Sequence, residues 1–410
     1  MNILVLNPGG NSLKTDFVRC SPGQQHAFEG QAEMTLRIED IGKNAKLTIL
    51  HVKSQTTHAA PVAAESYEEA AAQALKWWTD HAEEHSLPKQ SEVDAIGIRV
   101  VHGAHEFTKP ALVDSLVISR IIAFESLAPL HNKSSIEILK PIRSCFSTVP
   151  IYAVFDTAFH NTIPEHAFTY AIPPELAHKH KIRRYGFHGI SHRYLLERFA
   201  YLAGKFPEDC NVITTHLESG CSITAIEHGR SIDNTMGLTP LEGLMMGTRS
   251  GDIDPSIIAL LMREEQMTID EIMTLLNKKS GLVGVSGISL DTRVLMQKYD
   301  SEARAKLAMD VFAYRARKAV GSYAAVLSRV DALIFGGGIA ENGSFVRKQI
   351  CEGLRGYGVA IDEQANRNLI DVEGKLSTED SSVQVWVIPT QEALEIAHEC
   401  YLESGLAWNK

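Results

Sequence analysis

Residues 3–18 read ILVLNPGGNSLKTDFV, and this stretch decides the fold class. The four apolar residues at its start predict a buried strand, the segment NPGGNS predicts a glycine-rich turn, and residues 13–18 predict a second strand. The same order returns in residues 212–226, where the turn contains Gly220-Cys221-Ser222 in place of Gly10-Asn11-Ser12. This short internal repeat predicts a duplicated α/β domain.

The rest of the chain alternates between strand and helix patterns. Apolar stretches predict further strands over residues 34–41, 46–52, 93–101, 151–155, 332–335 and 385–388. Helical spacing predicts helices over residues 65–84 and 301–330 and a closing helix that ends near residue 404. Pro255 predicts one more helix start, and the capping box of Thr268 and Glu271 predicts another, in a helix that stops at Gly281. With 410 residues and no long linker, we expect two closely packed domains.

The composition excludes several function classes. The chain is 44% hydrophobic and 22% charged, with a formal net charge of −10 and a pI of about 5.9. We expect neither nucleic acid nor an anionic membrane as the main partner, because both require a basic surface. The sequence shows neither a signal peptide nor an apolar run of membrane-spanning length. Six cysteines without a CxxC pair fit a cytoplasmic location.

Three predicted strands end in turns that are rich in glycine, serine and asparagine, at residues 7–12, 216–222 and 336–338. Such turns expose backbone N–H groups that bind phosphate oxygens. None of them has the spacing of a P-loop or of a dinucleotide-binding motif. Three such turns in a duplicated α/β frame predict a two-domain kinase that closes on a nucleotide.

Charged residues follow the same strands. Arg99 and Arg249 are candidate clamps for anionic oxygens, because a guanidinium binds carboxylate or phosphate with two parallel hydrogen bonds. Asp156 and Glu392 are candidate Mg²⁺ partners, and His188 is a candidate contact of the transferred group. Each of these residues also has a structural explanation: an ion pair for an arginine, a turn or cap for an aspartate, a hydrogen-bonded core residue for a histidine.

Two other reactions fit the sequence less well. His188 and His192 are spaced like a zinc-binding pair, but they lack the glutamate of HExxH, and Gly189 weakens the helix that would bring both rings to one face. The Gly-x-Ser turns also lack the GxSxG pattern of a serine hydrolase.

Long stretches of the chain resemble the acetate kinase family of short-chain carboxylate kinases. The resemblance is carried by VVHG (100–103), LAPLHN (127–132), FDTAFH (155–160), YGFHG (185–189) and TPLEGLMMGTRSGDIDP (239–255). It implies an α/β protein with two related domains of the actin-like (ribonuclease H-like) ATPase fold and an interdomain active-site cleft. The implied domains are residues 1–155 plus 393–410 and a nucleotide-binding domain at 156–392. The resemblance also implies a homodimer, ATP or ADP as co-substrate, and Mg²⁺, with Mn²⁺ as an alternative.

Carried over position by position, the resemblance implies a role for each candidate residue. Asn7 and Glu392 would hold the metal. The implied nucleotide-binding residues are Ser12, Lys14, His216, Gly220, Asp291, Thr292, Arg293, Gly338, Ile339 and Asn342. Arg99 would bind the substrate carboxylate, and the pocket for its alkyl end would contain Val101, Leu130, Phe187 and Pro240. The implied catalytic residues are Asp156, His188, Arg249 and Arg99.

The implied reaction is the reversible conversion of ATP and acetate to ADP and acetyl phosphate by direct in-line transfer. Val101 implies a small pocket that favours acetate, with propionate or butyrate as the alternative acceptor. A carboxylic acid with a pKa of about 4 is already ionised at neutral pH, so the acceptor needs no general base. We therefore expect Asp156 to organise charge, through a metal-bound water or through Arg249, rather than to accept a proton.

Two turns depart from the family pattern. The first reads NPGGNSLK (residues 7–14) where the family has Asn-x-Gly-Ser-Ser-Ser-x-Lys, and the second has Glu218 and Ser219 where the family has Gly and Asn. A carboxylate in a loop that is expected to meet a triphosphate predicts weaker or altered donor binding, unless its side chain turns to solvent. A catalytically weak nucleotide-binding regulatory module is therefore the alternative from another functional class.

Overall fold

The computed structural model describes residues 1–52, 56–124 and 132–405. The chain divides into two compact units, one of Met1–Phe159 with Gln391–Lys410 and one of His160–Thr390. The first division falls four residues after the expected one at 155/156, and the second falls two residues before the expected one at 392/393. Asp156 and Glu392 therefore both belong to the first unit.

The first unit is built on an eight-stranded mixed sheet with the strand order β5-β4-β3-β2-β1-β6-β8-β7. β1, β6 and β8 run parallel, so their carboxyl ends meet at one edge. The strands are β1 (Asn2–Pro8), β2 (Leu13–Arg19), β3 (Gln31–Glu39), β4 (Lys46–His51), β5 (Thr56–Pro61), β6 (Ala95–Val100), β7 (Ala111–Leu112) and β8 (Ile151–Phe155). The sequence did not predict β5, because this edge strand is exposed at every residue and carries no alternating pattern.

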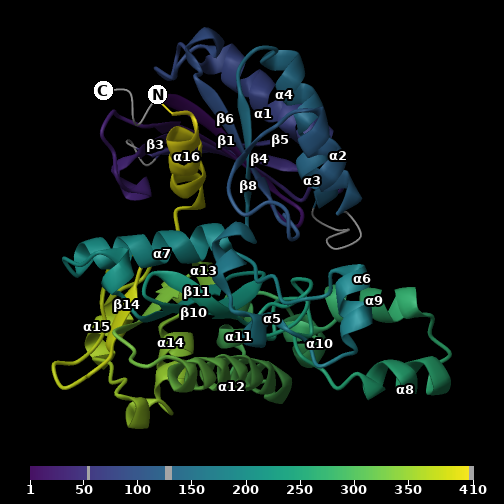
Figure 1. The fold of residues 1–410 in the computed structure, drawn as a ribbon, viewed down its shortest axis with the longest axis vertical. Helices are drawn as coiled ribbons and strands as arrows, with labels where there is room; N and C mark the ends of the chain where they lie inside the picture. Colours follow the sequence, from purple (N-terminus) through teal and green to yellow (C-terminus); the bar gives the residue numbers. More distant parts are fainter. Residues whose placement is uncertain (53–55, 125–131, 406–410) are drawn as a thin grey trace. The chain divides into compact units, whose positions relative to one another are not determined.

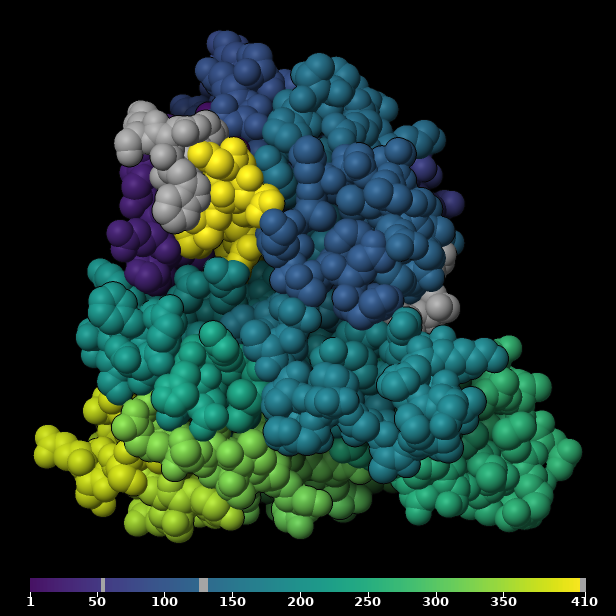
Figure 2. Space-filling view, in the orientation of Figure 1, coloured from purple at the N-terminus to yellow at the C-terminus, as the bar shows by residue number. Residues whose placement is uncertain are grey.

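Helices pack on both faces of this sheet. Helix α16 lies on one side of the strands, and α1 and α4 lie on the other (Figure 1). Leu4 and Leu6 face the core that α1 and α4 share, whereas Gly97 of β6 lies against Ile396 and Cys400 of α16. The helices of this unit are α1 (Tyr67–His81), α2 (Ser115–Ala123), α3 (Asn132–Glu137), α4 (Leu139–Cys145) and α16 (Glu392–Glu403). Figure 2 shows α16, in yellow, close to the purple N-terminal segment, and α16 contacts η1 (Ala27–Glu29) there. The closing helix thus completes the unit that the first strand begins.

The second unit repeats the arrangement on a six-stranded sheet with the order β11-β10-β9-β12-β14-β13. In both units an antiparallel meander is followed by two parallel strands, so β1, β2, β3, β6 and β8 correspond to β9, β10, β11, β12 and β14. This order confirms the predicted duplication. The strands are β9 (Val212–Leu217), β10 (Cys221–Glu227), β11 (Arg230–Asn234), β12 (Ala332–Gly336), β13 (Gly374–Lys375) and β14 (Gln384–Val387).

Helices α7 and α12 cover opposite faces of the second sheet (Figure 1). The predicted capping box opens α9, but Gly281 begins the next helix rather than ending this one, and the predicted helix over 301–330 is α12. The helices are α5 (Glu165–Phe168), α6 (Pro174–His180), α7 (Gly189–Leu202), α8 (Ser256–Glu264), α9 (Ile269–Lys278), α10 (Gly281–Ser286), α11 (Thr292–Gln297), α12 (Ala303–Val326), α13 (Gly338–Asn342), α14 (Ser344–Cys351) and α15 (Glu363–Asn368). Within the described ranges, no helix is both long and apolar enough to span a bilayer.

Candidate active site

In the first unit, four of the predicted residues form one hydrogen-bonded cluster at the carboxyl ends of β1, β6 and β8. Arg99 donates from Nε and Nη2 to Oδ2 of Asp156, at 3.0 and 2.5 Å. Its Nη1 donates to Oδ1 of Asn7 at 3.1 Å, and Nδ2 of Asn7 donates to Oε2 of Glu392 at 2.7 Å. Parallel strands bring Asn7, Arg99 and Asp156 together, and the start of α16 adds Glu392, which lies 385 positions from Asn7 in sequence.

The Arg99–Asp156 pair is largely removed from water, with 12% and 1% of the two side chains exposed. We predicted a metal-bound water or Arg249 as the group through which Asp156 acts, and the structure adds Arg99 as a direct partner. A buried ion pair that loses one member leaves an uncompensated charge, so each side chain fixes the other. The pair therefore holds one guanidinium in place at the strand ends.

The cluster offers oxygen ligands of the kind that Mg²⁺ prefers, from Glu392 and from the Asn7 amide. In this conformation the amide oxygen of Asn7 accepts from Arg99 and its NH₂ group faces Glu392. Asn7 thus orients the Glu392 carboxylate, and a direct bond from Asn7 to a metal requires the amide to turn. The donor set fits a magnesium ion held by Glu392.

The first glycine-rich turn lies beside this cluster. Gly9 donates its N–H to the carbonyl oxygen of Ser12 at 2.7 Å, and Lys14 lies directly opposite Asn7 in the β1–β2 register. The hydroxyl of Tyr67 donates to the Gly9 carbonyl at 2.6 Å. Burial raises the pKa of Tyr67 to about 12, so it remains a donor at neutral pH. We did not predict this contact, because in the sequence Tyr67 resembles any other residue of an amphipathic helix.

In the second unit, a chain of hydrogen bonds fixes His188. Nδ1 of His188 and Nε2 of His192 each lie 2.8 Å from the hydroxyl oxygen of Ser222, and Nδ1 of His192 lies 2.7 Å from that of Thr214. Burial lowers the pKa of His192 well below its usual value, so this ring is neutral at pH 7. The HxxxH spacing thus builds a hydrogen-bonded chain through a serine. The predicted strand-turn-strand segment that forms β9 and β10 could have indicated the role of Ser222, because the β9–β10 register places Ser222 opposite His216.

Three further predicted residues gather around His188. Its ring centroid lies 4.2 Å from that of His216. A Cβ atom on Gly220 would lie 3.3 Å from His188 Nε2 and 3.4 Å from Arg249 Nη1, so both side chains approach this turn closely. His188 also adopts a φ of 58°, a strained value for a residue other than glycine. The structure therefore brings together His188, His216, Gly220 and Arg249.

The residues expected at the ribose and adenine lie at two helix starts. Asp291 caps α11 by accepting from the backbone N–H of Arg293, and the guanidinium of Arg293, through its hydrogen bond, lowers the pKa of the Asp291 carboxyl. The second helix is α13, which contains Gly338, Ile339 and Asn342. Glu341, which we did not predict, holds the turn before α13 by accepting from the N–H groups of Gly337 and Thr390 at 2.7 and 2.9 Å.

The expected apolar pocket residues are distributed over both units. Val101 belongs to the first unit, Phe187 and Pro240 belong to the second, all three are buried, and Leu130 lies outside the described residues. His160 supports Phe187, because its Nε2 donates to the Phe187 carbonyl at 2.9 Å. Burial lowers the pKa of His160 to about 4, which makes it a neutral structural residue.

Glu218 lies beside the group around His188. Its Oε2 is 3.7 Å from Nε2 of His216, and half of its side chain is exposed. The backbone N–H of Glu218 donates to the Gly220 carbonyl at 3.1 Å, which keeps the turn closed. The carboxylate thus remains next to a predicted phosphate-binding histidine although water reaches it.

Comparison with known proteins gives matches over nearly the whole chain. The model of the Acetokinase family matches residues 2–398. The acetate kinase of Caldanaerobacter subterraneus subsp. tengcongensis is 44% identical over 404 residues, which cover 97% of this chain and 98% of that protein.

Two solved structures have the same fold. The crystal structure of Porphyromonas gingivalis acetate kinase has a TM-score of 0.87 at 34% identity and covers 98% of this chain and 99% of its own. A propionate kinase from Francisella tularensis subsp. tularensis has a TM-score of 0.87 at 40% identity and covers 97% and 98%. These likenesses confirm the expected actin-like fold with two related α/β domains.

We predict that Glu218 weakens binding of the phosphoryl donor. Replacing it by Gly or Gln removes a negative charge next to His216, so the KM for ATP should fall several-fold while kcat changes little. Initial rates over a range of ATP concentrations, at saturating Mg²⁺, measure this. Glu208→Gln, an exposed charge loss in the same unit, is the control and should leave KM unchanged. An unchanged or higher KM in both Glu218 variants would reject the prediction.

Proposed function

The chain belongs to the acetokinase family, and from this premise we propose that it transfers the terminal phosphoryl group of ATP to acetate, reversibly and with Mg²⁺. As a member, it is a phosphotransferase of the acetate kinase type whose acceptor is a carboxyl group, and ATP is its co-substrate. Acetate as the preferred acceptor, the metal and the residue roles are the parts that we propose.

The observation that carries the proposal is the cluster of Arg99, Asp156, Asn7 and Glu392. It combines a fixed cation with a carboxylate of the type that holds Mg²⁺, at the carboxyl ends of three parallel strands. In-line phosphoryl transfer requires little more of a protein than positioning and charge neutralisation. A silent relative has no chemical use for this cluster, so we do not favour the regulatory alternative.

The acceptor determines which chemistry the side chains must supply. Acetate is ionised at neutral pH and attacks phosphorus without losing a proton. The work that remains is to bring one anion up to another, and fixed guanidinium groups reduce that repulsion. In this proposal Arg99 orients the acceptor carboxylate, Asp156 holds Arg99, and His188 and Arg249 donate hydrogen bonds to the transferred group.

The metal site is proposed at Glu392, with Asn7 orienting its carboxylate. A bound Mg²⁺ supplies positive charge to the polyphosphate. The role of this chain is to present one carboxylate at the start of α16, where the hydrogen bond from Asn7 fixes its direction. A homodimer and a cytoplasmic location, implied by the resemblance and by the cysteine pattern, stay predictions.

Acyl phosphate trapping tests the function most simply. Incubation with ATP, Mg²⁺ and hydroxylamine should give acetohydroxamate from acetate, a smaller kcat/KM with propionate, and a much smaller one with butyrate. One added methylene changes discrimination by about 1–3 kcal/mol, or roughly 10- to 200-fold. Propionate is the second candidate, because a propionate kinase is 40% identical to this chain. No hydroxamate from any of the acids would contradict the proposal.

We predict that Asp156→Asn lowers kcat/KM for acetate at least about tenfold, a loss of about 1.4 kcal/mol of transition-state binding, without changing the shape of the pH–rate profile. The reason is that Asp156 holds Arg99 and transfers no proton. The Asp156→Asn variant should also show an altered dependence of the reaction rate on the Mg²⁺ concentration. Asp80→Asn, an exposed residue of the same unit, is the control. A variant with normal Mg²⁺ dependence that has lost one limb of the pH profile would identify Asp156 as an acid–base group instead.

A further inference from the structure

The loop that carries Pro240 has no regular structure to hold it, since residues 235–250 form neither helix nor strand. The side chain of Arg184 holds this loop by hydrogen bonds. Nη2 of Arg184 donates to Oε1 of Glu242 at 2.7 Å. Nη1 donates to the carbonyl oxygens of Asn234, Thr235 and Met236, at 2.7, 3.2 and 3.2 Å. One guanidinium thus binds the loop before and after Pro240.

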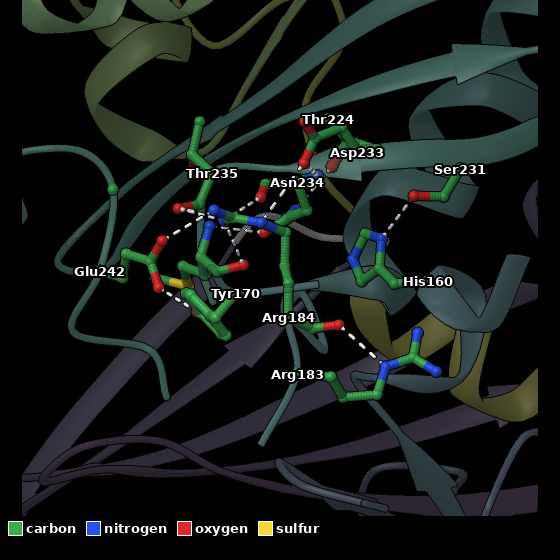
Figure 3. Close-up of polar contacts among 12 residues, drawn as sticks. His160, Tyr170, Arg183, Arg184, Thr224, Ser231, Asp233, Asn234, Thr235 and Glu242 are labelled. Atoms are coloured by element: carbon green, nitrogen blue, oxygen red, sulfur yellow. Dashed lines mark hydrogen bonds and ion pairs between the residues drawn. The ribbon is translucent and has the colours of Figure 1, made fainter. Parts of the chain in front are cut away.

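Tyr170 completes the arrangement. Its hydroxyl donates to Oε2 of Glu242 and accepts from the backbone N–H of Leu238 at 2.8 Å. Burial, reinforced by the hydrogen bond to Glu242, raises the pKa of Tyr170 above its usual value, so the phenol stays a donor. Figure 3 shows the Glu242 carboxylate between Tyr170 and Arg184. We call Tyr170, Arg184 and Glu242 the loop clamp.

The loop clamp is tightly built and remains charged. Burial opposes the charge on Arg184, but the carboxylates of Glu242 and Asp233 outweigh it and raise the pKa of the guanidinium. A Cβ atom on Gly237 would overlap both the Glu242 carboxylate and the Tyr170 hydroxyl, so the backbone passes directly beneath the clamp. Glu242 therefore has a fixed position relative to the backbone on both sides of Pro240.

Two predicted functional residues depend on this loop. Pro240 is a predicted wall of the acyl pocket, and its carbonyl oxygen accepts from Nη1 of Arg249 at 3.1 Å. Arg249 in turn approaches the turn at Gly220, which His188 also approaches. A shift of Pro240 would move the pocket wall and would also remove a hydrogen bond that orients Arg249.

We propose that Glu242 is a positioning residue that sets both the acceptor discrimination and the rate of the reaction. It acts through the loop clamp, which fixes the Pro240 ring and, by the Pro240 carbonyl, the Arg249 guanidinium. This inference rests on the proposed function, and it adds a determinant of acceptor size that does not itself touch the acceptor. The role predicts a coupled loss: a looser pocket wall and a less ordered Arg249.

Steady-state kinetics of Glu242→Ala, Glu242→Gln and Tyr170→Phe test the proposal. In Glu242→Ala, kcat with acetate should fall at least about tenfold. The ratio of kcat/KM for acetate to that for propionate should fall at least about threefold, because the looser wall admits the longer acid. The KM for ATP should stay within about twofold. Glu242→Gln, which keeps one acceptor oxygen, should retain intermediate values.

The controls separate positioning from general stability. Glu265→Ala, an exposed residue of the same unit, should leave every parameter unchanged. The losses from Glu242→Ala and Tyr170→Phe should not add in the double variant, because both act on one clamp. Hydrogen exchange supplies a readout without catalysis: the amide of Leu238 and residues 237–249 should exchange faster in both Glu242 variants than in the wild type.

The outcomes are distinguishable. Glu242 variants with an unchanged acetate-to-propionate ratio, or with unchanged exchange in the loop, would overturn the positioning role. A wild-type protein that forms no acyl phosphate would contradict the proposed function instead. The exchange rates would still decide whether Glu242 holds the loop.

Discussion

The guanidinium of Arg99 is the group on which the cluster in the first unit depends. It lies where three parallel strands end, and its hydrogen bonds reach Asp156 on one side and Asn7 on the other. Asn7 in turn donates a hydrogen bond that orients the carboxylate of Glu392, the first residue of α16. One largely buried cation therefore fixes the direction of a carboxylate, an amide and, through the amide, the proposed metal ligand. Loss of Asp156 would leave that cation without its closest counter-charge.

In the second unit, different contacts fix the predicted site residues His188 and Arg249. His188, His192 and Ser222 form a buried hydrogen-bonded chain, and the loop clamp holds Pro240 in position for Arg249. Neutral donors and acceptors order His188, whereas the Arg184–Glu242 ion pair holds the loop whose Pro240 carbonyl accepts from Arg249. Both devices supply groups that are fixed before a substrate binds, which is what electrostatic stabilisation of a transferred phosphoryl group requires.

The polar and charged residues that lie at strand ends could be predicted from the sequence. Arg99 and Asp156 were predicted from their places at strand ends, and the resemblance added Asn7. That the three residues meet follows from the parallel strands β1, β6 and β8 of the structure. Sequence reasoning did not find Tyr67, Glu341 or the loop clamp, since their contacts join irregular segments and helix sides over distances in sequence that no periodicity encodes. The resemblance named Pro240 and Arg249 but gave no reason why they keep their places. The edge strand β5 was missed for a simpler cause, the lack of any buried face.

The central claim is that a carboxylate oxygen of the acceptor itself forms the new bond to the transferred phosphorus, with the charges of both reactants neutralised by this chain. Acetate labelled with ¹⁸O in both carboxylate oxygens tests it directly, with ³¹P NMR of the acetyl phosphate formed. The account predicts an isotope-shifted phosphorus signal for the whole product, because the bridging oxygen comes from acetate. Acetyl phosphate without that shift would show that the acetate oxygen never bonds to phosphorus, and it would contradict the account.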